Sequence, residues 1–371
     1  MLRPFTLHRP ETAEEACALL AGLGEDAAAY AGGTELLLLM KLGLLRPRHL
    51  VDVKRIGGFG DITDGPRLTI GAAVTHRAVE RSALVRARCS LVGAVARHVA
   101  NVRVRNVGTV GGNLAFADPH SDLATLFLTL DAAVELVSPR GRRELSLAEF
   151  VRGPWETARA SDELLASIRP TTSTARPTTS ARWWRSSCAG RSGSPPRERG
   201  APSPASDSRT PWWPEGGGVK IRVIVNGRAR ELEIDAHALL LDVLRDGLDL
   251  KGAKRSCDMQ VCGACTVLVD GLAVSACTYL ALEADGRSVL TVEGLADGES
   301  LHPLQRAFID AGAVQCGFCT SGMLLTARAM LAENAKPTRA DVLHYLRGSL
   351  CRCTGYRKIV DAVLAAAENA R

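Results

Sequence analysis

The sequence has few aromatic residues and no long apolar run. Phe, Trp and Tyr make up 4% of its 371 residues, and apolar runs such as Leu36 to Met40 are short. A helix that spans a bilayer needs about 20 apolar residues, so the sequence predicts no membrane span. Residues 1–11 also lack the basic start and apolar core of a secretory signal. We therefore expect a cytoplasmic protein, whose cysteines stay reduced and available to metals.

Leu, Ile, Val, Phe and Met are absent between residues 171 and 214. Four of the five tryptophans lie in that stretch, at Trp183, Trp184, Trp212 and Trp213. A segment of this composition cannot build a packed core, so we expect it to be disordered. Its seven Arg, against one Glu and one Asp, contribute +5 of the net charge of +6. The rest of the chain is near neutral, and we predict no nucleic-acid partner.

The chain contains eleven cysteines, and eight of them form two groups of four. The first group is Cys257, Cys262, Cys265 and Cys277. The second group is Cys316, Cys319, Cys351 and Cys353. Four thiolates hold one iron–sulfur cluster, and C-x4-C-x2-C followed by a distant Cys is the plant-type [2Fe–2S] spacing. Two zinc sites are the alternative, because C-x2-C pairs also bind zinc.

The sequence around these cysteines resembles the small iron–sulfur subunit of the molybdenum hydroxylases. That family includes xanthine dehydrogenase, aldehyde oxidoreductase, aerobic carbon monoxide dehydrogenase and hydroxybenzoyl-CoA reductase. The matching runs are residues 257–266, 315–320 and 350–356. The resemblance implies that the eight cysteines hold two [2Fe–2S] clusters and that Gln315 hydrogen-bonds the pterin. It also implies a ferredoxin-like β-grasp domain at 219–295 and a four-helix domain at 296–371.

Residues 1–170 alternate helix and strand patterns and contain two glycine-rich turns, at residues 31–35 and 108–113. Glycine lets backbone N–H groups approach an anion, because no Cβ stands in the way. Each turn alone is more often a plain tight turn. Neither turn is the G-x-G-x-x-G of a dinucleotide site, so we do not infer NAD binding.

Together the two turns resemble the FAD-binding middle subunit of the same family. The resemblance implies an α/β FAD-binding domain of the PCMH-like flavoprotein type at 1–170. The cofactor-binding residues that it implies are Gly32, Gly33, Thr34, Glu35, Thr109, Gly111, Gly112, Asn113, Phe116 and Asp122. The two glycine-rich backbones would hold the FAD pyrophosphate, Phe116 would lie near the flavin, and Asp122 would hold the ribose.

The FAD subunit of that family continues with a further domain of about a hundred residues, which covers one side of the cofactor. This chain has residues 171–218 instead, so we expect weakened FAD binding. The composition of that segment favours a frame-shifted stretch that joins two subunits, and the alternative is a genuine disordered linker. Translation of the gene in its other two frames would decide between them.

These features predict an α+β multidomain protein with the following elements. Helices are expected at residues 11–23, 123–130, 239–247, 302–311, 320–334, 338–348 and 356–369, with Thr320 and Thr354 as helix caps. Residues 79–99 are expected to be mostly helical. Strands are expected at residues 49–53, 68–72, 133–137, 219–225, 229–234, 266–269 and 272–276.

The predicted function is that of an electron-transfer component of a molybdenum hydroxylase. By resemblance, electrons pass from molybdopterin on a separate large subunit through the helical-domain cluster, the ferredoxin-type cluster and FAD to an external acceptor. The chain would then be an oxidoreductase subunit of a hetero-oligomer, with no catalytic residue of its own. The alternatives are a stand-alone [2Fe–2S] carrier with a non-functional flavin portion, a zinc-binding scaffold, and a self-sufficient flavin enzyme.

Overall fold

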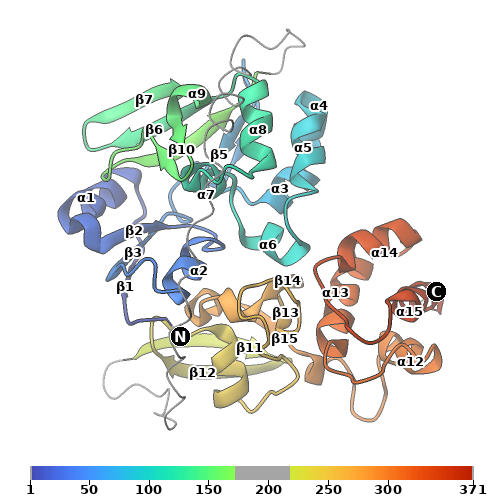
Figure 1. Ribbon diagram of the computed structural model, residues 1–371. Helices are drawn as coiled ribbons and strands as arrows, with labels where there is room; N and C mark the ends of the chain where they lie inside the picture. The colour runs from blue at the N-terminus through green and yellow to red at the C-terminus, as the bar shows by residue number, and fades with distance from the viewer. Residues whose placement is uncertain (1, 172–217, 370–371) are drawn as a thin grey trace, which may run out of the picture.

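The computed structural model describes residues 2–171 and 218–369 of the chain. The predicted frame-shifted segment or linker lies outside the described residues, apart from one residue at each end. Figure 1 shows a mixed α/β N-terminal part, a β-sheet part below it and a helical part at one side. The predicted α+β multidomain fold is thereby confirmed.

The N-terminal part begins with a small parallel sheet in the order β1–β3–β2. Its strands are β1 (Thr6–His8), β2 (Ala27–Tyr30) and β3 (His49–Asp52). Helix α1 (Ala13–Leu23) joins β1 to β2, and helix α2 (Leu36–Lys41) follows β2. The Thr12 hydroxyl caps α1 by accepting from the N–H of Glu15. These crossovers leave the turn between β2 and α2 at the end of the strands, where ligands commonly bind.

A second sheet of five antiparallel strands follows, in the order β4–β5–β10–β6–β7. Its strands are β4 (Ile62–Thr63), β5 (Thr69–Gly71), β6 (Ala133–Ser138), β7 (Gly141–Ser146) and β10 (Leu164–Arg169). The accompanying helices are α3 (His76–Arg81), α4 (Ala83–Arg88), α5 (Ser90–Ala96), α6 (Val102–Val107), α7 (Val110–Phe116) and α8 (Asp122–Thr129). The short elements α9 (Leu147–Phe150), β8 (Val151–Gly153) and β9 (Glu156–Thr157) complete this part.

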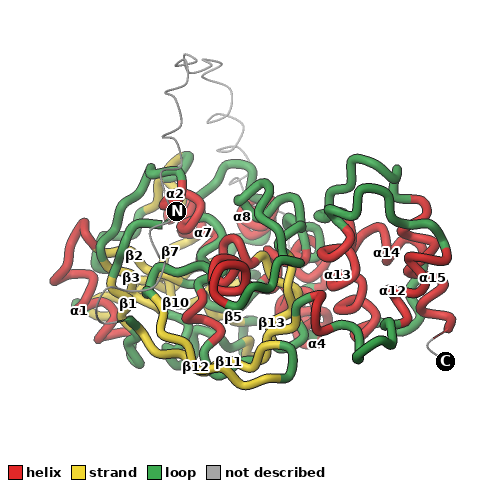
Figure 2. The backbone as a smooth tube through the Cα atoms, turned by 90° about the horizontal axis from the view of Figure 1, so that it is seen from below, coloured by secondary structure: helices red, strands yellow, loops and turns green. Residues whose placement is uncertain are grey.

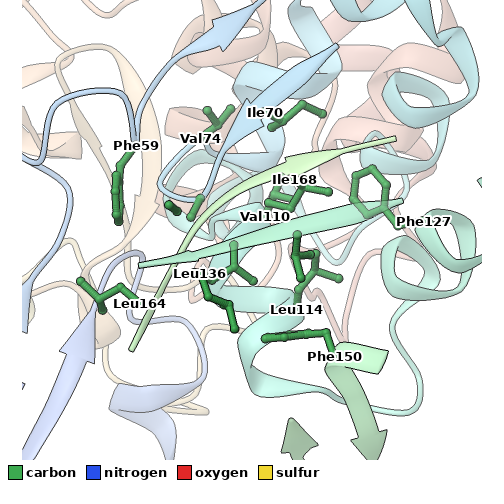
Figure 3. Close-up of a cluster of buried hydrophobic side chains, with 14 of the residues drawn as sticks. Phe59, Ile70, Val74, Val110, Leu114, Phe127, Leu136, Phe150, Leu164 and Ile168 are labelled. Carbon is green, nitrogen blue, oxygen red and sulfur yellow. The ribbon is translucent and has the colours of Figure 1, made fainter. Parts of the chain in front are cut away.

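The core of this part lies between the second sheet and its helices (Figure 3). Ile70 and Ile168 come from neighbouring strands, while Val110 and Leu114 come from α7, and all are fully buried. Phe127 of α8 is also completely buried. This packing holds α7 against the sheet.

Residues 219–290 form the β-sheet part, whose strands lie in the order β12–β11–β15–β13–β14. The strands are β11 (Val219–Val225), β12 (Arg228–Ile234), β13 (Thr266–Val269), β14 (Leu272–Ser275) and β15 (Ser288–Leu290). Both hairpin turns have positive φ at their two central residues, 50° and 78° at Asn226 and Gly227, and 48° and 80° at Asp270 and Gly271. Such values are those of type I′ turns, as the Asn-Gly sequence predicts. Helix α11 (Leu240–Asp242) runs into a π-helix, Val243–Gly247.

The C-terminal part is helical: α12 (Pro303–Asp310), α13 (Thr320–Glu333), α14 (Arg339–Leu346) and α15 (Arg357–Asn369). Figure 2 shows these helices gathered at one end of the molecule. Helix α13 packs on strand β13, so the helical part rests directly on the β-sheet part.

One hydrophobic core joins the first sheet to the β-sheet part. Phe5, Leu37 and Leu50 from the N-terminal region pack in the same cluster as Val223 and Val267. The N-terminal part and the β-sheet part therefore bury apolar surface against each other. Burial of apolar surface is the main source of stabilisation in folded proteins.

Residues 79–99 are mostly helical, as predicted, but in short helices: Ser82 ends α3 and begins α4, and Cys89 separates α4 from α5. One local prediction in this part was wrong. The second glycine turn is the first turn of α7, with the Thr109 hydroxyl accepting from the N–H of Gly112. Glycine disfavours helices, yet Gly111 packs where its absent Cβ would lie 2.4 Å from that of Ala72.

Replacement of Phe127 tests the core that holds α7 and α8. We expect Phe127→Ala to lower the free energy of unfolding by about 3–5 kcal/mol, because a fully buried ring is deleted. Urea unfolding followed by circular dichroism measures the change. The control is Leu91→Ala on α5, where the side chain is 53% exposed and the expected change is within about 0.5 kcal/mol. Equal effects of the two substitutions would contradict this packing.

Candidate cofactor sites

The first group of four cysteines lies in the loop before β13 and in the turn after β14. The loop contains three residues with left-handed backbone, Asp258, Gln260 and Gly263, with φ of 58°, 54° and 78°. These turns point N–H groups inward, and the N–H groups of Met259 and Cys262 donate to Sγ of Cys257 at 3.5 and 3.3 Å. Hydrogen bonds to sulfur are one way in which a protein sets the potential of a cluster.

The thiols of the first group meet in pairs, Cys257 with Cys262 and Cys265 with Cys277. The hydrogen bond from Cys265 lowers the pKa of the Cys277 thiol to about 7. The same bond, together with burial, raises the pKa of Cys265. Thiolates are the form that binds metal.

The second group lies at the starts of two helices. Cys319 stands at the N-cap of α13, and Cys351 and Cys353 precede α15. Sγ of Cys353 lies 3.5 Å from Sγ of Cys316. The predicted cap at Thr320 was wrong, because Thr320 is the first residue inside α13 and no side chain caps this helix. Thr354 does hydrogen-bond backbone, accepting from the N–H of Tyr356.

Pairing recurs in the second group, Cys316 with Cys353 and Cys319 with Cys351. Burial, and then the bond with Cys351, raise the pKa of the Cys319 thiol to about 12. For Cys351, burial acts in the same direction, but hydrogen bonds from Thr354 outweigh it and lower the pKa to about 7. The Thr354 N–H donates to Sγ of Cys351 at 3.4 Å.

These donor sets fit two-iron clusters. Within the two described ranges, no three His, Cys, Asp or Glu side chains are placed to hold a single metal ion. A zinc site requires four ligands around one point. Two pairs of thiols instead match two irons that each take two cysteines, as in a [2Fe–2S] cluster.

The two groups of cysteines are in direct backbone contact. The N–H of Leu350, next to Cys351, donates to the carbonyl of Cys262 at 2.8 Å. In addition, a Cβ on Gly322 of α13 would lie 2.1 Å from the carbonyl oxygen of Gly263. Only glycine allows this approach of helix to loop.

A pocket of about 360 Å³ lies between the two glycine-rich segments. Its walls include most of the predicted FAD residues: Gly32, Gly33, Thr34, Glu35, Thr109, Gly111, Gly112, Asn113 and Phe116. Asp122 is exposed and lines a separate pocket with Val95 and His98. Its neighbour Ser121 donates to Oδ1 of the pocket residue Asn113 at 2.6 Å. Gln315 is exposed beside Cys316.

The geometry of this pocket suits an anionic ligand. A Cβ on Gly32 would lie 2.1 Å from the carbonyl oxygen of Val107, so the two segments can approach only because residue 32 is glycine. Gly33 has φ of 68°, which turns the chain back toward α2. In the described part of the chain, the N–H groups of Gly33, Thr34 and Glu35 make no hydrogen bond. Such N–H groups are available to a phosphate.

The wall of the pocket is hydrogen-bonded to the loop that carries Cys257, Cys262 and Cys265. Nε2 of Gln260 donates to the carbonyl oxygen of Thr34 at 2.6 Å. Lys41 of α2 donates to the carbonyl of Cys277 at 2.9 Å and forms an ion pair with Asp258 at 2.8 Å. One hydrogen bond therefore joins the pocket wall to the loop before β13 that carries Cys257, Cys262 and Cys265, which we call the cluster loop.

Sequence reasoning missed several residues of the site, namely Lys41, His76, Asn101, Arg103 and Gln260. His76 lines the pocket, and burial, with the nearby Arg105, lowers its pKa to about 4. Asn101 donates to the carbonyl of Gln260 at 3.1 Å. The side chain of Arg103 is fully buried between the three parts of the protein. No motif marks these residues, since their roles arise from contacts across the chain.

Three protein-family profiles match the chain. The FAD binding domain in molybdopterin dehydrogenase matches residues 3–170. The 2Fe-2S iron-sulfur cluster binding domain matches residues 223–302, and the [2Fe-2S] binding domain matches residues 291–364. The pocket falls within the first match and the two groups of cysteines within the other two.

The nicotine 6-hydroxylase small subunit of Paenarthrobacter nicotinovorans is 53% identical over 148 residues, which are 40% of this chain and 89% of that protein. The chain belongs to the molybdenum hydroxylase family. Another family member, the nicotinate dehydrogenase small FeS subunit of Eubacterium barkeri, is 44% identical over 150 residues, 40% of this chain and 96% of that protein. The aldehyde oxidoreductase of Megalodesulfovibrio gigas is 47% identical over 148 residues, 39% of this chain but 16% of that larger protein.

Solved structures of molybdenum hydroxylases also match parts of the chain. Cu,Mo-CO dehydrogenase is 37% identical, with a TM-score of 0.45, over 46% of this chain and 60% of that one. Quinoline 2-oxidoreductase from Pseudomonas putida 86 is 47% identical, with a TM-score of 0.41, over 42% of this chain and 96% of that one.

Family membership makes this chain an electron-transfer subunit of an oxidoreductase, with an FAD-binding domain and two [2Fe–2S] domains. The predictions of family, enzyme class and cofactor types are confirmed. Of the helices that the structure describes, none has both the length and the apolar character of a membrane span.

Substitution of Gly32 tests the pocket. We expect Gly32→Ala to lower the flavin content of the purified protein at least tenfold, because the new methyl group would displace the backbone of Val107. The ratio of flavin absorbance to protein after desalting gives the measurement. The matched control is Gly22→Ala, where the Cβ would meet nothing within 4 Å. Retention of flavin by Gly32→Ala would show that the cofactor binds elsewhere.

Proposed function

We propose that this chain accepts electrons from a molybdopterin-containing partner subunit and delivers them to FAD and an external acceptor. In this proposal, Cys316, Cys319, Cys351 and Cys353 hold the cluster that faces the partner. Cys257, Cys262, Cys265 and Cys277 hold the cluster that faces FAD. When bound, the clusters carry single electrons and FAD combines them into a two-electron transfer. The residues of this chain set the distances and the electrostatic surroundings.

The observation that carries the proposal is a continuous series of contacts. Leu350, beside Cys351, donates its N–H to the carbonyl of Cys262. Two residues before Cys262, the side chain of Gln260 donates to the carbonyl of Thr34 in the pocket wall. Hydrogen bonds thus connect the second group of cysteines to the first group, and the first group to the pocket. This is the order of cofactors that the proposed relay requires.

The second group of cysteines supports a partner at that end of the relay. Cys316 and Cys353 are exposed. Beside them, Phe318 is 47% exposed and Leu350 53% exposed. Large apolar side chains that surround a functional group on the surface are typical of an interface with another protein. A large subunit docked here would bury both thiols and place its own cofactor beside them.

Substrate selectivity is proposed to lie on that partner. Relatives include subunits named for nicotine hydroxylase, nicotinate dehydrogenase, aldehyde oxidoreductase and xanthine dehydrogenase. Such variety is expected if this subunit type moves electrons and does not bind substrate. We place the complex in the cytoplasm, because clusters need reduced cysteines, and the ten cysteines of the described residues are unbridged.

Anaerobic reconstitution of the full chain tests the assignment of ligands. We expect two distinct electron paramagnetic resonance signals after reduction, and iron and sulfide contents that agree with two [2Fe–2S] clusters. Cys265→Ser should remove only one signal, and Cys353→Ser only the other, because each substitution deletes a thiol from a different group. Quantitation of iron, acid-labile sulfide and flavin accompanies the spectra.

The control is Cys89→Ser, which should leave both signals intact. Cys89 lies between α4 and α5 in the N-terminal part of the protein, residues 2–171, which we call the flavin part. Zinc without acid-labile sulfide would contradict the proposal and select a zinc scaffold. Two clusters without flavin, even with FAD added in excess, would select a stand-alone electron carrier. A chain that oxidises substrate without a partner would contradict the dependence on a large subunit.

A further inference from the structure

Arg103 is a buried cation that joins the three parts of the protein. It lies on α6 of the flavin part, and 1% of its surface is exposed. Its Nε donates to Oγ of Ser275 on β14 at 3.1 Å, and Nη1 donates to Oγ of Ser349 before α15 at 3.3 Å. Nη2 donates to the carbonyls of Val261, at 3.4 Å, and Gly348. The guanidinium therefore lies between β14, the cluster loop and the segment before α15. Figure 1 shows α6, which carries Arg103, beside β14.

These hydrogen bonds give each nitrogen of the guanidinium a partner but do not balance its charge. Each of the four acceptors named above is a neutral hydroxyl or carbonyl oxygen. A buried guanidinium stays protonated and is costly unless an opposite charge lies close by. Burial lowers the pKa of the Arg103 guanidinium, and negative charge on the thiols of the first group, that of Cys265 foremost, would act against this.

The backbone between those cysteines comes into contact with the guanidinium. A Cβ on Gly263 would lie 3.0 Å from Nη1 and 3.2 Å from Cζ of Arg103. Gly263 also has φ of 78°, so glycine is required there by backbone and by space. The loop is shaped so that a cation from the flavin part can lie against it.

Lys41 shows the contrasting case. It also comes from the flavin part and also reaches the first cluster loop, but its ammonium forms an ion pair with Asp258 at 2.8 Å. That pair contributes no net charge at the loop. Among the residues that the structure describes, Arg103 forms hydrogen bonds to neutral acceptors and no ion pair, so it brings a net positive charge to the loop.

We propose that Arg103 sets the reduction potential of the first cluster. The inference rests on the proposed function, since it requires a [2Fe–2S] cluster on Cys257, Cys262, Cys265 and Cys277. A one-electron reduction adds one negative charge to the cluster, and the fixed guanidinium stabilises that charge in a site of low dielectric constant. Arg103 thereby raises the reduction potential of the first cluster, the one that is proposed to lie next to FAD. The flavin part, by docking, controls the potential of the cluster that feeds it.

Redox titration of the reconstituted full chain, followed by paramagnetic resonance, tests this role. Arg103→Gln should favour the oxidised first cluster by at least tenfold, a fall of 59 mV or more for a one-electron couple. Ser349→Asp should act in the same direction, because it keeps the arginine and adds a compensating carboxylate. Arg103→Lys, which keeps the charge, should stay close to the wild-type potential.

The matched control is Arg347→Gln. Arg347 also joins the helical part to the N-terminal part, by donating to the carbonyl oxygens of His98 and Ala100 at 2.6 and 2.8 Å, but its side chain is exposed. Solvent screens its charge, so the potential of the first cluster should remain that of the wild type.

The outcomes separate this inference from the proposed function. Unchanged potentials in Arg103→Gln and Ser349→Asp, with both signals present, would overturn the role of Arg103 and leave the relay intact. Loss of the first cluster from both variants would make Arg103 a purely structural residue and overturn the inference as well. A wild-type chain without two cluster signals would contradict the proposed function itself.

Discussion

The carbonyl oxygen of Gly263 lies 2.1 Å from the position that a Cβ on Gly322 would occupy. This approach of helix α13 to the cluster loop is the contact on which the arrangement of both cysteine groups depends. Helix α13 begins immediately after Cys319, and residue 263 lies between Cys262 and Cys265. Because backbone meets backbone here, no side-chain flexibility separates the two groups. The bond from Leu350 to Cys262 fixes the same spacing from the other cysteine pair.

The sequence was most informative where the structural signal is local. Type I′ turns at Asn226-Gly227 and Asp270-Gly271 set the two hairpins, and their strands lie within a residue of the predicted bounds. The four C-terminal helices were likewise predicted within two residues at each end. The spacing of the cysteines indicated two groups of four, because ligand spacing within a short loop is constrained by the geometry of the cluster. The assignment of each thiol as a ligand stays a prediction.

Interactions between distant parts of the chain left no such signal. The glycine pair 111–112 was interpreted as a turn, since glycine disfavours helices by about 1 kcal/mol, but packing against Ala72 and the Thr109 cap outweigh that preference. Arg103 and Gln260 look like ordinary polar residues until the fold brings Ser275 and Thr34 to them. Ser349 likewise looks ordinary in the sequence, and its hydroxyl accepts from Arg103. Pairwise contacts across 170 residues or more arise only from the docking of whole domains.

The buried cluster that unites Phe5, Leu37 and Leu50 with Val223 and Val267 has a consequence for the architecture of the molecule. Neither half alone would have a fully polar surface, because separation would expose to solvent the apolar residues that the two halves bury against each other. The apolar interface, more than the covalent connection, is therefore expected to hold the halves together. Two separate polypeptides with the same apolar surfaces would be expected to associate into the same structure.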